Sequence, residues 1–295
     1  MPHPHPHPHA HPHPTSHPTS LPSAPPSRDA VVTALRSAGC VFAEDEAELI
    51  IAAAPTPRDI AALVERRAAG LPLELVVGWA EFRGLRITVE PGVFVPRRRT
   101  EFLVEQALAA TRPQSQPRAE TRTGPRAREA VVVDLCCGSG AVGAALAAGL
   151  GRAELHAADI DPAAVRCARR NVAALGGQVH TGDLFDALPG GLRGRVDILA
   201  ANVPYVPSDE IGLLPPEARD HEPRVALDGG ADGLDVLRRV AAGAPGWLAP
   251  GGCLLVETSS GQAPAAVAAF TDAGLRTRLA VCEERHAHVV IGVRT

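Results

Sequence analysis

The chain has 295 residues, a hydrophobic content of 45% and a formal net charge of −4 at pH 7. This length suits about two domains, and the charge gives no basic field of the kind that attracts nucleic acid. No apolar run approaches the ~20 residues that span a bilayer, and no cationic segment with an apolar run behind it marks a secretory signal. The six cysteines form no C-x-x-C pair, so we expect a cytoplasmic protein with reduced thiols, no metal site and no membrane segment.

The first segment in chain order has low complexity. His and Pro alternate over most of residues 2–14, and proline recurs up to residue 26. Regularly placed proline blocks both helix formation and sheet pairing, so we expect residues 1–27 to be a disordered, solvated tail. Its histidines are compatible with weak metal binding, but an inert extension is the simpler interpretation.

A small helical domain is predicted over residues 28–81. Ser27 stands where a cap for the first helix, "RDAVVTALRSA", is needed. In "TPRDIAALVERRAAG" we expect Thr56 as N-cap, Pro57 at the first helical position and Gly70 as the stop.

A hairpin and a polar loop follow. Residues 82–99 are predicted as a β-hairpin linker with Gly84 near its turn. The remaining residues, 100–295, are predicted as one domain that begins with a helix. Inside it, residues 111–129 are rich in Pro, Arg and Ser, so we expect a flexible surface loop. Its five arginines are compatible with an RNA or acidic partner, but a solvated insertion is favoured.

From residue 130 onward, strand-like and helix-like runs alternate. The strand-like runs are "AVVVDL", "AELHAAD", "VDILAAN" and "GCLLVET", and the helical stretches are 141–149, 162–175, 232–243 and 262–273. This alternation predicts a mostly parallel sheet with helices on both faces. The runs "LRTRLAVCEE" and "AHVVIGVRT" have no helix between them, so we expect an antiparallel hairpin at one edge.

The stretch "VVVDLCCGSGAVGAAL" indicates a buried strand, a glycine-containing turn and a helix start. Gly138 and Gly140 allow positive φ angles and close backbone approach at the carboxyl end of a strand, where open α/β sheets bind ligands. The pattern is not a P-loop, because no G-K-[ST] follows, which argues against a triphosphate. Alone it is a weak signal, because such turns also serve to pack a helix on a sheet.

Three acidic residues lie at neighbouring strand ends. Asp159 closes the second strand, where a carboxylate can accept both hydroxyls of a ribose. Asp183, in "TGDLFD", lies at the end of a third strand between "AELHAAD" and "VDILAAN", which makes "VDILAAN" the fourth. Asp183 is expected near an adenine edge, while Asp134 fixes the turn or reaches the amino-acid end of the cofactor. Asp161 is expected to cap the next helix, at Pro162. A ribose acceptor beside a glycine turn that is not a P-loop indicates S-adenosylmethionine, an adenosine that carries an amino acid.

The fourth strand ends in Asn202-Val203-Pro204-Tyr205. The Asn202 carboxamide oxygen and a backbone carbonyl can accept both protons of a substrate NH₂ group, which aims the nitrogen lone pair at the methyl carbon. Tyr205 supplies a flat wall for a planar amide or base. The alternative is a loop that contains Asn and Pro by chance.

Four blocks of sequence resemble the HemK-type (PrmC-like) methyltransferases, which modify the glutamine of a Gly-Gly-Gln motif in peptide chain release factors. The blocks are 72–104, 132–143, 202–205 and 220–240. The resemblance implies a class I S-adenosylmethionine-dependent methyltransferase fold, Rossmann-like with a seven-stranded sheet, plus a small N-terminal helical domain. It implies glutamine binding by the 202–205 turn. Beside Asp134, the cofactor residues that it implies are Cys136, Cys137, Gly138, Ser139, Gly140, Asp159, Asp183 and Asn202.

Three departures from the family pattern point to a divergent, paralogous branch. Val203 replaces the first proline of Asn-Pro-Pro-Tyr, and Cys136 stands where a glycine is usual. Arg98 and Arg99 replace the usual Pro and Glu in a block that lies near the active-site entrance in the family. The added positive charge suggests a different protein substrate.

Three classes of function remain open from the sequence. The leading hypothesis is methyl transfer to the N5 amide nitrogen of a protein glutamine, with a release factor as partner. The alternative is a nucleic-acid amino-group methyltransferase of the adenine N6 type, because a flipped base presents a similar planar NH₂. A cofactor-binding protein without catalysis is the third. The oligomeric state is not predictable from the sequence.

Overall fold

The computed structural model describes residues 26–111 and 129–295. The expectations for the tail over residues 1–25 and for the loop over residues 112–128 therefore lie outside the described part of the chain. Within that part, no helix combines the length and the apolar character needed to cross a membrane.

The N-terminal region is helical, as expected. The Ser27 hydroxyl accepts the Ala30 N–H at 3.3 Å and so caps the first helix. The predicted cap at Thr56 is wrong, because the third helix begins at Asp59, whose carboxylate accepts the Thr56 N–H at 3.0 Å and its hydroxyl at 2.7 Å. The Thr56 hydroxyl is therefore used as a donor. The helices are α1 (Arg28–Ser37), α2 (Ala43–Ala53), α3 (Asp59–Ala68) and α4 (Leu73–Val77).

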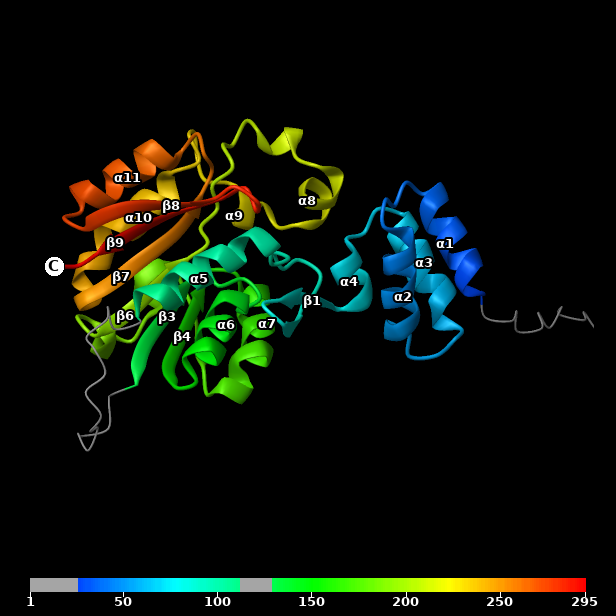
Figure 1. The fold of residues 1–295 in the computed structure, drawn as a ribbon, viewed down its shortest axis with the longest axis horizontal. Coiled ribbons are helices and arrows are strands. Elements are labelled where there is room, and N and C mark those ends of the chain that lie inside the picture. The colour runs from blue at the N-terminus through cyan, green and yellow to red at the C-terminus, as the bar shows by residue number, and fades with distance from the viewer. Residues whose placement is uncertain (1–25, 112–128) are drawn as a thin grey trace, which may run out of the picture.

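A short hairpin connects these helices to the rest of the chain (Figure 1). Strand β1 (Trp79–Phe82) pairs antiparallel with β2 (Leu85–Thr88), and β1 begins ahead of the predicted start at residue 82. The two turn residues, Arg83 and Gly84, both have positive φ angles, 51° and 73°. Such a two-residue turn matches the twist of the paired strands.

A seven-stranded sheet forms the larger part of the molecule. Its order is β5-β4-β3-β6-β7-β9-β8, parallel except where β9 pairs antiparallel with β7 and β8. The predicted mostly parallel sheet with an antiparallel edge hairpin is thus confirmed. The strand order reverses between β3 and β6, which makes the carboxyl ends of these strands a topological switch point. The strands are β3 (Ala130–Leu135), β4 (Ala153–Asp159), β5 (Gln178–Thr181), β6 (Val196–Ala201), β7 (Leu248–Thr258), β8 (Arg276–Cys282) and β9 (Ala287–Val293).

Helices cover both faces of the sheet, with α5, α6 and α7 on one and α10 and α11 on the other (Figure 1). Between β6 and α10, two short helices that the sequence pattern does not predict, α8 and α9, form an excursion away from the sheet. The helices are α5 (Glu101–Ala110), α6 (Ala141–Leu150), α7 (Pro162–Val172), α8 (Pro216–His221), α9 (Arg224–Leu227), α10 (Asp235–Gly243) and α11 (Ala263–Asp272).

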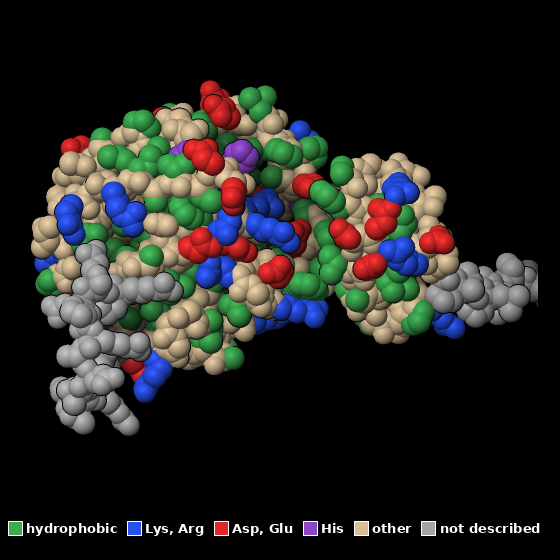
Figure 2. Space-filling view, in the orientation of Figure 1, with side chains coloured by type: hydrophobic (Ala, Val, Ile, Leu, Met, Phe, Trp, Pro, Cys, Tyr) green, Lys and Arg blue, Asp and Glu red, His purple; other side chains and the backbone are tan. Residues whose placement is uncertain are grey.

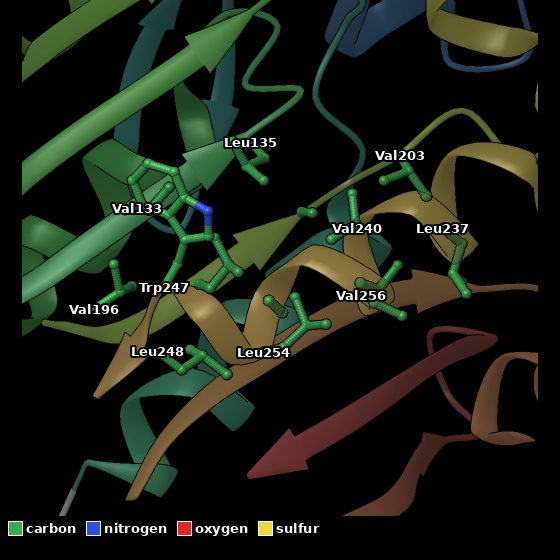
Figure 3. Close-up of a cluster of buried hydrophobic side chains, with 14 of the residues drawn as sticks. Val133, Leu135, Val196, Val203, Leu237, Val240, Trp247, Leu248, Leu254 and Val256 are labelled. Carbon is green, nitrogen blue, oxygen red and sulfur yellow. The ribbon is translucent and has the colours of Figure 1, made fainter. Parts of the chain in front are cut away.

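The larger core cluster lies between the sheet and α10 and α11. It contains alternate residues of β3, such as Val133 and Leu135, whereas Val132 belongs to the cluster on the opposite face. Both faces are buried, which is why β3 reads as a continuous apolar run. Figure 3 draws Val203 in the same cluster as Leu237, so the core extends to the residue just after the Asn202 position.

Candidate active site

A cavity of about 1090 Å³ opens at the carboxyl ends of β3, β4 and β6. Its volume lies slightly above the ~300–1,000 Å³ typical of ligand pockets, so there is room for a cofactor and part of an acceptor. The segment 93–100 and the excursion that carries α8 and α9 supply its outer walls. The predicted site residues that line it are Asp134, Cys136, Cys137, Gly138, Ser139, Asp159, Asp183, Asn202, Val203, Pro204 and Tyr205.

Gly140 does not line the cavity. A Cβ at this position would lie 3.1 Å from the Ala168 Cβ, and its φ angle is 78°. Gly140 therefore serves to pack the turn closely against α7. Gly138 has a φ of 53°, and a Cβ there would meet the Phe94 Cβ at 3.9 Å, whereas Cys136 holds a φ of 53° with a side chain attached. Left-handed backbone is strained for a residue other than glycine, so the turn stores strain at Cys136.

Asp134 joins the strand to the start of α6. Its side chain is buried, and its Oδ2 accepts the Gly143 N–H at 2.8 Å. Its Oδ1 is also buried and has no hydrogen-bond partner among the described residues. Burial raises the pKa of Asp134 to about 7, although the Gly143 hydrogen bond opposes that shift. The hydrogen bond to Gly143 agrees with the expectation that Asp134 fixes the turn. The Oδ1 atom remains available to a ligand.

Asp159 ties the same turn to the end of β4. Its Oδ2 accepts the Gly138 N–H at 2.9 Å and its Oδ1 accepts the Asp161 N–H at 2.9 Å. Each oxygen retains a second lone pair for a ligand in the cavity. Burial raises the pKa of Asp159, and backbone hydrogen bonds from Asp161, Gly138 and Ile160 lower it. Asp161 caps α7 as predicted, by accepting the Ala163 N–H at 2.8 Å.

Asp183 lies at the edge of the cavity with a partner that the sequence did not indicate. Its Oδ2 accepts a hydrogen bond from the Arg239 guanidinium at 2.7 Å. Arg239 comes from α10 and also lines the cavity. The pair therefore places a cation beside the acid expected at the adenine edge.

The turn after β6 is held on both sides. The Asn202 Oδ1 is buried and lacks a partner within the described part of the chain. Val203 is 1% exposed and packs into the core beside Leu237 (Figure 3). The Tyr205 carbonyl accepts the Gln262 Nε2 at 2.8 Å. A Cβ on Gly233 would lie 2.2 Å from the same carbonyl oxygen. Glycine at this position therefore allows the loop of the 220–240 block to pack closely against the turn.

Charged side chains of both signs line the cavity, and Figure 2 shows Arg and acidic side chains mixed on the face beside the N-terminal helices. Arg97 and Glu222 meet at 2.6 Å, and burial raises the pKa of Glu222 despite that cation. Of the two arginines that depart from the family pattern, Arg99 lines the cavity and Arg98 does not. The side chain of Arg98 is 84% exposed, 3.8 Å from Glu81.

Comparisons with known proteins agree on methyl transfer. Residues 121–211 match the family model of the methyltransferase small domain. The chain is 40% identical to the release factor glutamine methyltransferase of Geobacter sulfurreducens, over 74% of this chain and 72% of that protein. It is 38% identical to the 4-amino-L-phenylalanine/4-methylamino-L-phenylalanine methyltransferase of Streptomyces pristinaespiralis, over 75% and 73%. A methyltransferase structure from Pyrococcus furiosus shares the fold, with a TM-score of 0.50, 15% identity and coverage of 72% and 90%.

Proposed function

The chain belongs to the family of release factor glutamine methyltransferases, and we propose that it methylates the N5 amide nitrogen of the Gly-Gly-Gln glutamine in a peptide chain release factor. The methyl donor is S-adenosylmethionine. The roles of individual residues in cofactor and acceptor binding are part of this proposal.

The observation that carries the proposal is the Asn202 carboxamide oxygen. It is a buried hydrogen-bond acceptor with no partner among the described residues, and Asn202 lines the cavity at the switch point of the sheet. A buried polar atom without a partner is costly, so such an atom in a cavity indicates a ligand donor. The NH₂ of a glutamine side chain is a donor of this kind.

The residues around the β3–α6 turn fit the cofactor. Asp159 would hold the ribose hydroxyls, and Asp134 with the 136–139 turn would hold the amino-acid end, where the orphaned Asp134 Oδ1 suits an ammonium group. Asp183 would lie beside the adenine. When bound, S-adenosylmethionine supplies a methyl group on a sulfonium sulfur, and the C–S bond breaks with its electron pair staying on sulfur.

The chain's own part in the reaction is orientation and electrostatics. The Asn202 Oδ1 would accept one N–H of the glutamine amide and the Val203 carbonyl the other, which fixes the direction of the nitrogen lone pair. The lone pair forms the new N–C bond, and the nitrogen then releases one proton. Positive charge grows on nitrogen during this step, and both oxygens are placed to stabilise it. Because the Val203 side chain is anchored in the core, its carbonyl is rigidly held.

The site gives little support to a nucleic-acid acceptor. A phosphate backbone needs cations that are free to release counterions. Four arginines that line the cavity each have an acidic partner: Arg97 with Glu222, Arg99 with Glu257, Arg224 with Asp228 and Arg239 with Asp183.

The test is mass spectrometry of unmethylated release factors from the source organism, incubated with this protein and S-adenosylmethionine. We expect a mass gain of one CH₂, mapped to the Gly-Gly-Gln glutamine, that is absent with Asn202→Ala. The variant should retain cofactor binding by calorimetry, which separates a lost acceptor contact from misfolding. Methylation of 4-amino-L-phenylalanine in a parallel reaction, with no release-factor product, would replace the protein acceptor by an aromatic amine.

A further inference from the structure

Arg99 makes three contacts inside the cavity wall. It lies in a single helical turn, Arg98–Thr100, just before α5. Its Nε lies 2.8 Å from the Glu257 Oε1, and its Nη2 donates a hydrogen bond to the Tyr205 hydroxyl. The guanidinium carbon is also 5.5 Å from the centroid of the Tyr205 ring, within the range of a cation–π contact.

Glu257 holds Arg99 from the interior. It lies near the end of β7 and is 2% exposed, so its carboxylate needs a cation close by. Burial raises the pKa of Glu257, and the neighbouring Arg99 lowers it. The rigid fork of the guanidinium can serve the carboxylate on one side and the phenol on the other at once.

Tyr205 is fixed at both ends by this arrangement. Its backbone carbonyl accepts the Gln262 Nε2, and its hydroxyl accepts from Arg99. The ring lines the cavity three residues beyond Asn202, where an acceptor amide must lie flat. The charge of Arg99 is balanced by Glu257, so its contribution is to hold the ring in place.

We propose that Arg99 is a positioning residue for the methyl acceptor, acting through Tyr205, with Glu257 as its anchor. The inference rests on the proposed function for the identity of the acceptor. Position 99 is one where the family pattern has Glu. The Glu257–Arg99–Tyr205 contacts, called the clamp here, are therefore a property of this chain. Arg98, the other departure, lies outside the cavity and is the matched control.

The contact itself can be tested without any acceptor. Tyr205 is the only tyrosine among the 295 residues, so protein grown with ring-¹³C tyrosine gives the NMR signals of this one ring. We expect Arg99→Met to shift the ring signals, whereas Arg98→Met leaves them at the wild-type position. Unchanged signals in Arg99→Met would overturn the clamp.

The kinetic consequence is a separation of acceptor and cofactor effects. With a release factor as acceptor, Arg99→Met should raise KM by about tenfold, the scale of one hydrogen bond to a charged group. The Kd for S-adenosylmethionine should stay within about twofold, because none of the predicted cofactor residues contacts Arg99. Arg99→Lys keeps a charge beside Glu257 but lacks the forked guanidinium. Relative to Arg99→Met, it should therefore recover most of the lost stability but leave KM raised.

A double-mutant cycle decides whether Arg99 acts through Tyr205. Tyr205→Phe should raise KM much as Arg99→Met does, and the double variant should be no worse than either. Additive effects on KM would contradict the inference. If Arg99→Met folds poorly because Glu257 is left without its cation, Arg99→Met with Glu257→Gln removes both charges and replaces it in the cycle.

The two proposals fail in different ways. A wild-type protein that methylates no release factor overturns the proposed function, while the NMR comparison still decides the Arg99–Tyr205 contact. A wild-type protein that is active, together with an Arg99→Met variant of unchanged KM, overturns the role of Arg99 alone.

Discussion

At the scale of single residues, the β3–α6 turn combines a strained backbone with an unusual side chain. Cys136 occupies the left-handed region with a φ of 53°, at a position where the family pattern has glycine. Its neighbour Cys137 is buried and lies outside that region. Burial raises the pKa of both thiols, which keeps them protonated at neutral pH and supports the view that they are packing residues.

Cys136→Gly should therefore stabilise the protein. Removing the left-handed strain should raise the free energy of unfolding by about 1 kcal/mol. The packing lost with the half-buried side chain should offset only part of this gain. The measurement is the urea midpoint at constant m-value. Cys137→Gly is the control, since a buried side chain is lost there without relief of strain, and it should destabilise. A loss of stability in Cys136→Gly would show that the thiol packing outweighs the strain.

Asp134 makes stability depend on pH. Its pKa is raised from 3.8 to about 7, so between these values the folded protein retains a proton that the unfolded chain has lost. Stability should fall as the pH rises from about 4 to about 7, and this contribution should level off above. Asp134→Asn should lose less stability between pH 5 and pH 8 than wild type does, as measured by urea denaturation at each pH. Equal losses in both proteins would exclude Asp134 as the source.

The same carboxyl predicts a pH dependence of cofactor affinity. If the ionised Asp134 pairs with the ammonium group of S-adenosylmethionine, binding should strengthen by about tenfold from pH 6 to pH 8. Isothermal titration at the two pH values measures the change. In Asp134→Asn the affinity should be weaker and nearly independent of pH over this interval, and a slope like that of wild type would contradict the assignment.

At the scale of elements, the loop before α10 determines where the 202–205 turn sits. The Gly229 N–H donates to the Val206 carbonyl at 2.9 Å, which draws the loop along the chain just after Tyr205. Gly233 then comes so close that no side chain fits between it and the Tyr205 carbonyl. Gly229 and Gly233 of "LDGGADGLD" are thus explained by backbone approach, to the Pro204 and Tyr205 carbonyls, a requirement that involves two segments at once.

Gly233→Ala should cost more than about 2 kcal/mol and should also disturb the acceptor site. The new methyl group adds a clash with the Tyr205 carbonyl and with Gln262 to the strain of a φ of 74°. Gly251→Ala is the control, because Gly251 has a φ of 77° with nothing within 4 Å and pays only for the backbone, about 1 kcal/mol. Thermal unfolding of the two variants compares the costs, and equal values would mean that the loop moves aside freely.

At the scale of the whole molecule, one arginine connects the N-terminal helices to the wall of the cavity. Arg67 of α3 pairs with Glu46 of α2 at 2.7 Å and with Glu217 of α8 at 2.9 Å. The first pair is nearly buried, whereas Glu217 is half exposed. The division into a helical domain over residues 28–81, a linker over 82–99 and a methyltransferase domain over 100–295 stays a prediction, and Arg67 offers a way to probe it.

Arg67→Met should destabilise the N-terminal helices strongly, by about 3–5 kcal/mol, because it leaves Glu46 buried without its cation. Glu217→Gln should cost under ~1 kcal/mol, since an exposed partner contributes little. Hydrogen exchange measured by mass spectrometry separates the two regions. We expect Arg67→Met to raise exchange in α1–α3 and leave β3, β4 and β6 protected, which supports separate domains. Equal loss of protection in both regions would contradict the division.

The sequence by itself determined the elements whose signals are local. Apolar runs such as "AVVVDL" specify strands, their alternation with helices specifies a parallel sheet, and a parallel sheet brings its carboxyl ends to one edge. Asp134, Asp159 and Asn202 could therefore be placed at one site, because each lies within one residue of the end of such a run. Gly140 does not line the cavity, and its predicted contact with the cofactor stays a prediction, since a glycine that packs against α7 and one that faces a cavity look the same in sequence.

Only the tertiary structure decided the contacts between distant segments. Arg99 and Glu257 meet because α5 begins beside the end of β7. No sequence pattern near either residue predicts that the two form a pair. The same holds for Arg239 with Asp183, and for α8 and α9, whose short helices are held by contacts at their ends such as Glu222 with Arg97. A charge pair depends on the distance between atoms in space, and a local pattern carries no information about that distance.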